Sequence, residues 1–409
     1  MMGPMDEQFP RRQDRPLPPP PDPWAPSSIP PLRPGPPYLM TEMIAAEPAL
    51  AGRIVARLTG DGGPAARLAA EVRRCRDASL PVAVVGCGTS EHAAMGIAAI
   101  FHDALRRPEP THGGPAAVPP WVVARQALEA ALDPWPGLCL AVSHEGGTWA
   151  TLEALRAARA AGATTALITA AAGSPAARLA DVLLATDELD QSWCHTVGYL
   201  SPLVAGVVVA GYLTGVLPDQ AAVANLVGAG LESGRAAAAD ALAARLAGAS
   251  RILVTAAGAD EPAARELVLK IEEGSWVPAA YRHLETILHG HLAAVDEGTA
   301  VVLVLTERRA RAQRVERARE VLTALATIGA SAGAILATGA ADGIPDLATP
   351  AGRITVPEAA SFLSGAAGLL SSAVPLQLVA EGLARHRGVN PDPIRRQDPR
   401  YRRAAEAVR

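Results

Sequence analysis

A short run of residues, Lys270-Ile271-Glu272-Glu273, holds the groups in this chain best suited to moving a proton. Lys270 is the only lysine in the sequence, and arginine supplies the other permanent positive charges. Retention of one lysine is expected where a guanidinium cannot replace the compact ammonium, although chance retention is the alternative. Glu272 and Glu273 could be a solvated helix end, but a carboxylate beside an ammonium also suits a catalytic base. We interpret the run as a candidate acid–base site.

Two further segments contain residues that could act as ligands or nucleophiles. His289 and His291 stand one residue apart and could bind a metal ion. They lie on an irregular segment without a third ligand nearby in the sequence, so we predict no metal site. Cys194 and Thr196 come just before an apolar helical pattern. There, Thr196 suits a helix cap or a ligand hydroxyl better than Cys194 suits a nucleophile.

Two glycine-containing loops follow buried apolar strands and open helices, which is where open α/β sheets bind ligands. The loop at 86–90, Gly-Cys-Gly-Thr-Ser, lacks the third glycine of a dinucleotide-binding motif, so its hydroxyls suit an oxyanion or a sugar oxygen better. The loop at 143–148, Ser-His-Glu-Gly-Gly-Thr, has glycines that let a ligand approach the backbone. An ordinary strand-to-helix turn is the alternative for this second loop. The candidate ligand-binding residues are Cys87, Gly88, Thr89, Ser90, Ser143, His144, Glu145, Gly146, Thr148 and Thr196.

Composition and charge restrict the class of protein. A chain of 409 residues, of which 49% are hydrophobic, suits two domains with a large core. A net charge of −4 gives no indication of binding to nucleic acid or to an anionic membrane. The four cysteines lack pairing or zinc spacing, which favours a reducing, cytoplasmic location. The longest apolar run, at 203–217, is shorter than a membrane span and predicts a buried helix.

The first part of the chain reads as a proline-rich arm followed by an α/β domain. Residues 1–37 contain too many prolines and too few apolar groups to fold, and we predict that they are disordered. Order should begin at Tyr38, with Thr41 capping a helix that ends at Leu58. Strands then alternate with helices up to about residue 240, which predicts a parallel sheet with right-handed crossovers. The expected strands are 81–85, 121–124, 138–142, 164–169 and 182–185, and a helix should cover 196–216.

A second domain, at 241–388, repeats the pattern of the first. Val84, Gly88, Glu91, Ala93 and Ala94 recur as Val254, Gly258, Glu261, Ala263 and Ala264, always 170 residues later. A spacing equal to a whole domain indicates a tandem duplication. The second copy has no counterpart of the loop at 143–148, since Glu307-Arg-Arg follows its own strand, and the two copies should therefore differ in role. Expected elements are strands at 251–255, 300–305, 333–337 and 353–356, a helix at 360–387, and a tail at 389–409.

These motifs resemble tandem sugar isomerase (SIS) domains, such as the isomerase half of glucosamine-6-phosphate synthase and the related aminosugar deaminases and fructosamine deglycases. The resemblance covers about residues 38 to 390 and includes Glu47-Pro48, the run 269–273 and Leu288-His289-Gly290. It implies an α/β protein made of two three-layer α/β/α sandwich domains with parallel sheets. It also implies an active site at a subunit interface, and hence a homodimer.

The same resemblance implies residue roles. Glu273 would move a proton between C1 and C2 of a sugar, and His289 would open the sugar ring. From the residues themselves, and not from the resemblance, we add Lys270 to the catalytic set and interpret His291 as a structural residue or one that supports His289. We expect a sugar phosphate or aminosugar ligand and either aldose–ketose isomerisation or removal of an amine. No metal or organic cofactor is expected, because the carbonyl of the substrate accepts the electrons. A sensor that binds a sugar derivative without turnover is the alternative.

Departures from the family pattern leave the substrate open. Glu145 stands where the family's phosphate loop has a serine, so hydroxyls or an ammonium become plausible ligands there. The tail from residue 388 onward contains no lysine for a Schiff base with a ketose. His291 stands where the family has a proline. No glutamine-splitting domain accompanies the two copies, and we therefore expect no glutaminase activity.

Overall fold

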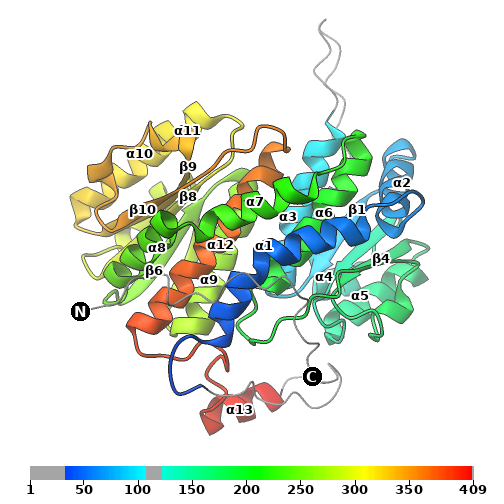
Figure 1. Ribbon diagram of the computed structural model, residues 1–409, viewed down its shortest axis with the longest axis horizontal. Coiled ribbons are helices and arrows are strands. Elements are labelled where there is room, and N and C mark those ends of the chain that lie inside the picture. Colours follow the sequence, from blue (N-terminus) through cyan, green and yellow to red (C-terminus); the bar gives the residue numbers. More distant parts are fainter. Residues whose placement is uncertain (1–32, 107–121, 408–409) are drawn as a thin grey trace, which may run out of the picture.

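The computed structural model describes residues 33–106 and 122–407, and it contains two parallel five-stranded sheets (Figure 1). Most of the predicted disordered arm, and Trp121 in the second expected strand, lie outside these residues. The first sheet has the order β2-β1-β3-β4-β5, and parallel pairing confirms the predicted fold class. Its strands are β1 Val82–Gly86, β2 Val122–Gln126, β3 Leu138–Val142, β4 Thr164–Thr169 and β5 Val182–Ala185.

The second sheet has the same order when its strands are counted from its own first strand, namely β7-β6-β8-β9-β10. The edge strand β7 was not predicted. All five of its residues are half-buried, so it lacks the apolar run that marks the inner strands. The strands are β6 Arg251–Ala256, β7 Ala279–His283, β8 Thr299–Leu305, β9 Ser331–Ala337 and β10 Gly352–Val356.

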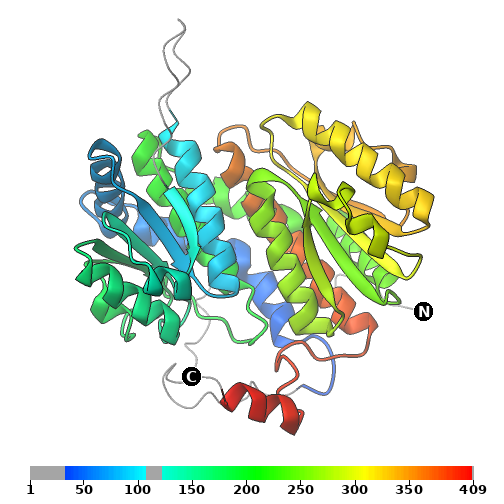
Figure 2. The same cartoon turned by 180° about the vertical axis from the view of Figure 1, so that it is seen from behind.

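Helices cover both faces of each sheet, and the inner helices are shared (Figures 1 and 2). The outer faces have separate small cores, formed with α4 and α5 on the first sheet and with α10 on the second. The helices are α1 Leu39–Leu58, α2 Pro64–Asp77, α3 Thr89–Leu105, α4 Ala127–Leu132, α5 Trp149–Ala160, α6 Val197–Thr214, α7 Gln220–Gly228, α8 Ser233–Leu246, α9 Glu261–Ser275, α10 Arg311–Ile328, α11 Thr338–Ala341, α12 Ser364–His386 and α13 Pro399–Glu406.

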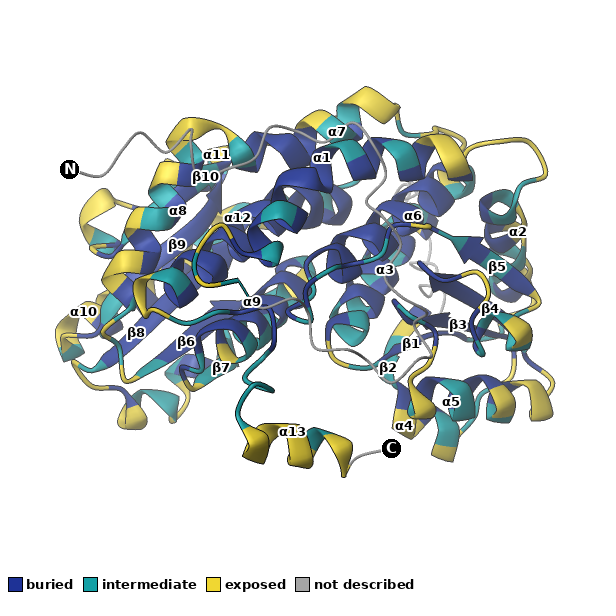
Figure 3. Ribbon diagram, turned by 60° about the horizontal axis from the view of Figure 1, so that its bottom comes forward, coloured by how far each residue is buried: buried dark blue, intermediate teal, exposed yellow. Residues whose placement is uncertain are grey.

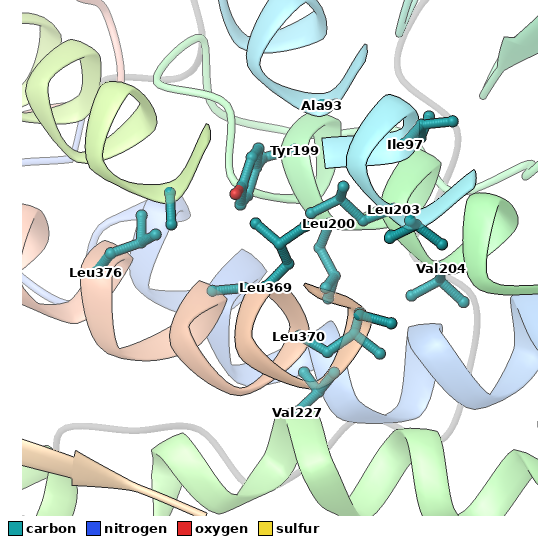
Figure 4. Close-up of a cluster of buried hydrophobic side chains, with 14 of the residues drawn as sticks. Ala93, Ile97, Tyr199, Leu200, Leu203, Val204, Val227, Leu369, Leu370 and Leu376 are labelled. Carbon is teal, nitrogen blue, oxygen red and sulfur yellow. The ribbon is translucent and has the colours of Figure 1, made fainter. Parts of the chain in front are cut away.

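The inner core joins the two halves of the chain. Helices α3 and α6 of the first half pack against α12 of the second half, as the close-up of the core shows (Figure 4). Both α6 and α12 are long and apolar enough to cross a membrane, but 83% and 100% of their apolar windows are buried inside the protein. They therefore serve as core helices here, as expected for the apolar run at 203–217. Burial is nearly continuous through this central layer (Figure 3).

The start of the first helix differs from the prediction. Tyr38, rather than Thr41, occupies the N-cap position, and Thr41 lies three residues into α1. The Thr41 hydroxyl accepts a hydrogen bond from the Tyr38 backbone N–H at 3.2 Å. Thr41 thus satisfies the helix start from inside the first turn, which is a role that N3 side chains can take. The predicted end of the helix at Leu58 is confirmed.

Candidate active site

Three charged side chains lie together on helix α9. The Nζ atom of Lys270 lies 2.5 Å from Oε2 of Glu273 and 3.5 Å from Oε1 of Glu266. Helical spacing explains the cluster, since residues three and four apart share one face of a helix. Lys270 and Glu266 are completely buried, whereas Glu273 exposes 23% of its side chain. Glu273 is therefore the member of the cluster that solvent or a ligand can reach.

The first half of the chain supplies the partners of Glu266. The Thr89 hydroxyl donates to Oε1 of Glu266 at 3.3 Å, and Nδ1 of His92 lies 2.7 Å from Oε2. Both partners stand in the first turn of α3, where Thr89 belongs to the glycine loop at 86–90 and His92 follows it. A carboxylate of the second half of the chain is thus held by residues of the first half. The cluster therefore lies between the two halves of the chain.

The surroundings shift the pKa values of Glu273 and Glu266 in opposite directions. Burial raises the pKa of Glu273, and the attraction of Lys270 offsets this only in part. Burial also disfavours ionised Glu266, but Lys270, His92 and Thr89 together hold its pKa below the usual range. Burial alone would lower the pKa of Lys270, yet the two carboxylates keep that pKa raised. Glu266 is therefore a fixed counter-ion, and Glu273 is the group better able to accept and return a proton.

The segment between β5 and α6 forms another side of the cluster. Cys194, predicted not to be a nucleophile, is fully buried, and its Sγ lies 3.7 Å from the position that a Cβ at Gly274, next to Glu273, would take. Burial is the main reason that the pKa of Cys194 is raised. A thiol with a raised pKa is a poor nucleophile at neutral pH. Cys194 therefore packs against the cluster as a buried apolar group.

The loop at 143–148 follows β3 as predicted, and internal contacts use much of its polar surface. The Ser143 hydroxyl accepts from the Gly146 N–H at 3.2 Å. Nε2 of His144 accepts from the Asp190 backbone N–H at 2.9 Å, and burial lowers the pKa of His144 to about 4. The His144 ring is therefore neutral, with its proton on Nδ1. Glu145 is half-buried and forms no hydrogen bond or ion pair with the described residues.

The other predicted ligand residues vary in exposure. Gly88 has a φ of 56° and is exposed, as a loop that approaches a ligand requires. Cys87 and Ser90 are half-buried, and Thr148 is exposed at the N-cap of α5. Thr196 is completely buried, so a ligand could reach its hydroxyl only after the protein opened.

A second buried polar group lies beside the cluster on α1 and α12. Nε2 of Gln377 donates to Oε1 of Glu47 at 2.8 Å and to the Thr196 carbonyl at 3.2 Å. Oε2 of Glu47 and the Thr196 hydroxyl have no partner among the described residues. Burial raises the pKa of Glu47 well above its ordinary value. A neutral carboxyl group costs less to bury than a carboxylate, so burial favours the protonated form of Glu47.

His289 does not share the Glu273 cluster within one chain. It lies on the loop after β7, and its side chain is 67% exposed. Its Nε2 lies 2.8 Å from Oε1 of Glu285, and none of its hydrogen bonds or ion pairs with described residues reaches Glu273. His291 follows in the next short helical turn. Within residues 33–106 and 122–407, no three His, Cys, Asp or Glu side chains are arranged to hold a metal ion.

One open cleft lies away from the Glu273 cluster. This cleft, of about 400 Å³, runs between α3, β2 and the loops of the second sheet. Its charged groups are paired, Arg309 with Asp103, Arg314 with Glu307 and Glu261 with Arg265. Paired charges have little left to offer a ligand, whereas the Glu273 cluster has an accessible carboxylate of raised pKa. We therefore assign the candidate active site to Glu273.

Several residues of the site were missed from the sequence. Glu266 could have been found, because it lies four residues before Lys270, a spacing that puts two residues on one face of a helix. Asp190 carried no motif, yet its carboxylate accepts the backbone N–H groups of Thr196 and Gly198. Arg396 stood in an arginine-rich tail without a distinguishing pattern. Its guanidinium lies 4.4 Å from the Trp193 ring centroid, at the edge of the site.

Comparison with known proteins supports the architecture. Residues 245–371 match the SIS domain family. A glutamine–fructose-6-phosphate aminotransferase (isomerizing) of Symbiobacterium thermophilum is 31% identical over 253 residues. That match covers 58% of this chain and 39% of the relative, so this chain spans well under half of that protein.

Solved structures give the same fold. The C-terminal domain of glucosamine-fructose-6-phosphate aminotransferase from Francisella tularensis has a TM-score of 0.72 at 18% identity, covering 87% of this chain and 98% of that one. Tagatose-6-phosphate ketose/aldose isomerase from Escherichia coli has a TM-score of 0.65 at 18% identity, covering 88% and 95%. Both matches extend across the two sheets, which agrees with the resemblance drawn from the motifs.

Proposed function

We propose that this protein, which is built from two SIS-type domains, binds a sugar derivative and moves a proton between C1 and C2 of that sugar. The reaction would be an aldose–ketose isomerisation or the removal of an amine from such a carbon. The observation that carries the proposal is Glu273, an accessible carboxylate of raised pKa beside the buried Lys270 ammonium. The names of the structural relatives, which include a ketose/aldose isomerase, point to the same chemistry.

The chemistry requires a base that takes one proton and returns it. The Glu273 carboxylate removes the proton from C2 of an open-chain aldose, and the electron pair moves through a new C1–C2 double bond onto the C1 carbonyl oxygen as an enediolate forms. The proton of the C2 hydroxyl then moves to the C1 oxygen. The protonated Glu273 returns its proton to C1 as the C2 carbonyl forms, which gives the ketose. A raised pKa favours this exchange, since a base works best when its pKa approaches the working pH. The carbonyl of the substrate serves as electron acceptor, so the step needs no metal ion or organic cofactor.

The positive charge of Lys270 limits the net negative charge of the site during this exchange. When Glu273 is ionised, Lys270 balances one of two neighbouring carboxylates, and Glu266 stays ionised throughout. Lys270 donates to Glu273 at 2.5 Å and fixes the orientation of the carboxylate. Fixed orientation of the base contributes to the rate because it holds the reacting atoms in a productive geometry.

Opening of the sugar ring would fall to His289 of a second copy. Within one chain His289 is exposed on the loop after β7, in contact with Glu285. The family resemblance implies an active site at a subunit interface, and an exposed histidine suits a group that is donated across such an interface. We therefore propose a homodimer. We also propose a cytoplasmic location, since all four cysteines are free.

A non-catalytic sugar sensor is the second candidate. The observation that favours it is the internal use of polar groups in the ligand loops. Ser143 accepts from the Gly146 N–H, and Thr89 donates to Glu266. Loops of this kind could close on a sugar derivative without supplying a second catalytic group.

A binding screen tests the shared part of both candidates. Thermal unfolding would be followed with neutral sugars, sugar phosphates and aminosugar phosphates, in wild type and in Glu273→Gln. At least one class should raise the unfolding temperature of both proteins, because binding to the native state stabilises it. A protein stabilised by none of these classes would contradict sugar binding.

A further inference from the structure

The segment between α12 and α13 is held firmly against the candidate active site. The Asp392 carboxylate accepts the backbone N–H groups of Leu39 at 2.9 Å and Met40 at 2.8 Å, at the start of α1. The Asp392 carbonyl accepts the Trp193 N–H at 3.0 Å. These bonds fix the segment to both α1 and the loop before α6. The position of Arg396, four residues later, follows from this anchoring.

Arg396 is a half-buried cation that makes no hydrogen bond or ion pair through its side chain with the described residues. Its guanidinium stacks on Trp193 with 4.4 Å between its central carbon and the ring centroid. Burial lowers the pKa of Arg396, while the charges of Glu273 and Glu145 act in the opposite direction. Packing places the Arg396 segment beside Glu273, because Pro391 and Cys194 both lie within 4 Å of the position that a Cβ at the neighbouring Gly274 would take. Neither carboxylate forms an ion pair with Arg396. Stacking fixes the plane of the guanidinium and leaves its N–H donors available.

Glu145 stands on the loop after β3, next to His144, whose ring centroid lies 5.0 Å from that of His195. His195 belongs to the same segment as Trp193, on which Arg396 stacks. Burial raises the pKa of Glu145, and the positive charge of Arg396 lowers it. The Gly146 N–H in the same loop is already used by Ser143. This loop therefore presents a carboxylate where an anion would otherwise bind, and it repels an anionic ligand group.

Lys270, the other cation of the site, cannot hold such a group. It is fully buried and already pairs with Glu266 and Glu273. Arg396 is the cation with available donors at this site in the described part of the chain. The unpaired Arg396 guanidinium and the unpaired Glu145 carboxylate thus stand on segments that both pack against the 193–196 segment beside Glu273.

We propose that Arg396 binds an anionic oxygen group of the sugar derivative, a carboxylate or a phosphate, while Glu145 accepts hydrogens from hydroxyl or ammonium groups of the same ligand. A guanidinium holds either oxyanion through two parallel N–H donors. The inference rests on the proposed binding of a sugar derivative at Glu273. It names the charge that the ligand carries and the residue that selects it.

Binding of matched probes tests this assignment. Glucose and fructose, their 6-phosphates and glucuronate would be titrated calorimetrically, at low salt, into wild type, Arg396→Gln and Arg395→Gln. Arg395 is the control, because it lies on the same segment but stacks on Trp276 and Tyr401. Wild type and Arg395→Gln should prefer an anionic probe to its neutral sugar by about 10- to 100-fold. Arg396→Gln should lose this preference and keep its affinity for the neutral sugar.

The outcomes separate the inference from the function on which it rests. Equal binding of neutral and anionic probes by wild type, or an unchanged preference in Arg396→Gln, would overturn the inference alone. Failure of every probe to bind wild type would overturn the proposed function and the inference together. Preference for glucuronate would identify a carboxylate as the anion, and preference for the 6-phosphates would identify a phosphate. Arg396→Lys should restore only part of the preference, because an ammonium lacks the paired donors.

Discussion

The loops after β3 and β8 occupy equivalent places in the two sheets, yet their glutamates have opposite surroundings. Ala141 of β3 and Leu303 of β8 pair with equivalent residues of β1 and β6. Four residues further along each chain segment stand Glu145 and Glu307. Glu307 is therefore the structural counterpart of Glu145, which the comparison of the two halves of the sequence did not reveal.

The carboxylate of Glu307 is fully paired with groups of the same protein. It is 4% exposed, and its Oε2 accepts the Ala259 N–H at 2.9 Å, in the turn that opens α9. The same oxygen pairs with Arg314. An internal carboxylate thus occupies the anion-binding start of this helix, where the dipole and the free N–H groups favour negative charge.

Glu145 is left without such partners. It is half-buried, forms no ion pair with described residues, and follows His144, whose ring contacts His195 in the segment on which Arg396 stacks. An internal ion pair completes the loop after β8, whereas the loop after β3 has none. The loop after β8 therefore has a structural role, and the loop after β3 is available for binding. The difference indicates that the first loop is completed by a ligand.

The largest difference between the Glu273 site and the ion-paired Glu307 loop should appear in turnover. Glu273→Gln keeps the size of the side chain and loses its ability to take a proton, so turnover should fall about 10²- to 10⁴-fold with little loss of binding. Glu307→Gln should keep near-normal turnover, because Glu307 belongs to the ion-paired region. Steady-state rates on the sugar derivative found by the binding screen measure both. An equal loss in the two variants would remove the distinction between the regions.

Stability should depend more on Lys270 than on Arg314, the cation that pairs with Glu307. Lys270→Met leaves Glu266 and Glu273 buried without a cation and should cost about 3–5 kcal/mol of unfolding free energy. Lys270→Arg keeps the charge but overfills a fully buried position, at about 1–3 kcal/mol. Arg314→Met should cost less than Lys270→Met, since the Arg314 side chain is 19% exposed. Urea denaturation would give these values, and full stability and activity of Lys270→Arg would make Lys270 replaceable.

Acid sensitivity should come from the first loop. His144 has a pKa of about 4 in the folded protein, against 6.5 in the unfolded chain, because burial disfavours its charged form. The unfolded chain therefore binds more protons between pH 6.5 and 4, and the native state loses up to about 3 kcal/mol as pH falls through this window. The equivalent residue of the second loop, Thr306, does not titrate. Unfolding curves of His144→Gln should show a shallower loss, and an unchanged slope would exclude His144 as its source.

The smallest contrast concerns the two glutamates themselves. Glu307→Gln removes a buried ion pair and should lower the unfolding free energy by about 1–3 kcal/mol. Glu145→Gln removes no hydrogen bond or ion pair with described residues and should change it by less than about 0.5 kcal/mol. Parallel thermal unfolding in the absence of ligand compares them. A loss from Glu145→Gln as large as that from Glu307→Gln would show that Glu145 is also structural.

Much of the fold could be predicted from local patterns. Buried parallel strands such as β1 and β8 are uninterrupted apolar runs. The residues that recur 170 positions later predicted a second sheet. Strand β7 could not be recognised, because a half-buried edge strand such as Ala279–His283 has no such run. The contact of Lys270 with Glu273 followed from helical spacing alone.

The rest of the site depends on contacts between distant parts of the chain. Asp392 binds the start of α1 across 353 positions of sequence, and Thr89 reaches Glu266 across 177. Neither contact leaves a local pattern. Arg396 likewise becomes distinctive only when the folded chain brings Trp193 beneath it. Sequence motifs located the loops, and tertiary packing decided which of their charges remain unpaired.

Hydrogen exchange on the bound sugar tests the central claim most directly. Wild type would be incubated in D₂O with the sugar derivative that stabilises it, and deuterium at each carbon would be measured by NMR. The account predicts deuterium at C1 or C2, because the proton held on Glu273 exchanges with solvent through the exposed part of its side chain. Tight binding without deuterium at either carbon would contradict proton transfer and leave the protein as a sensor.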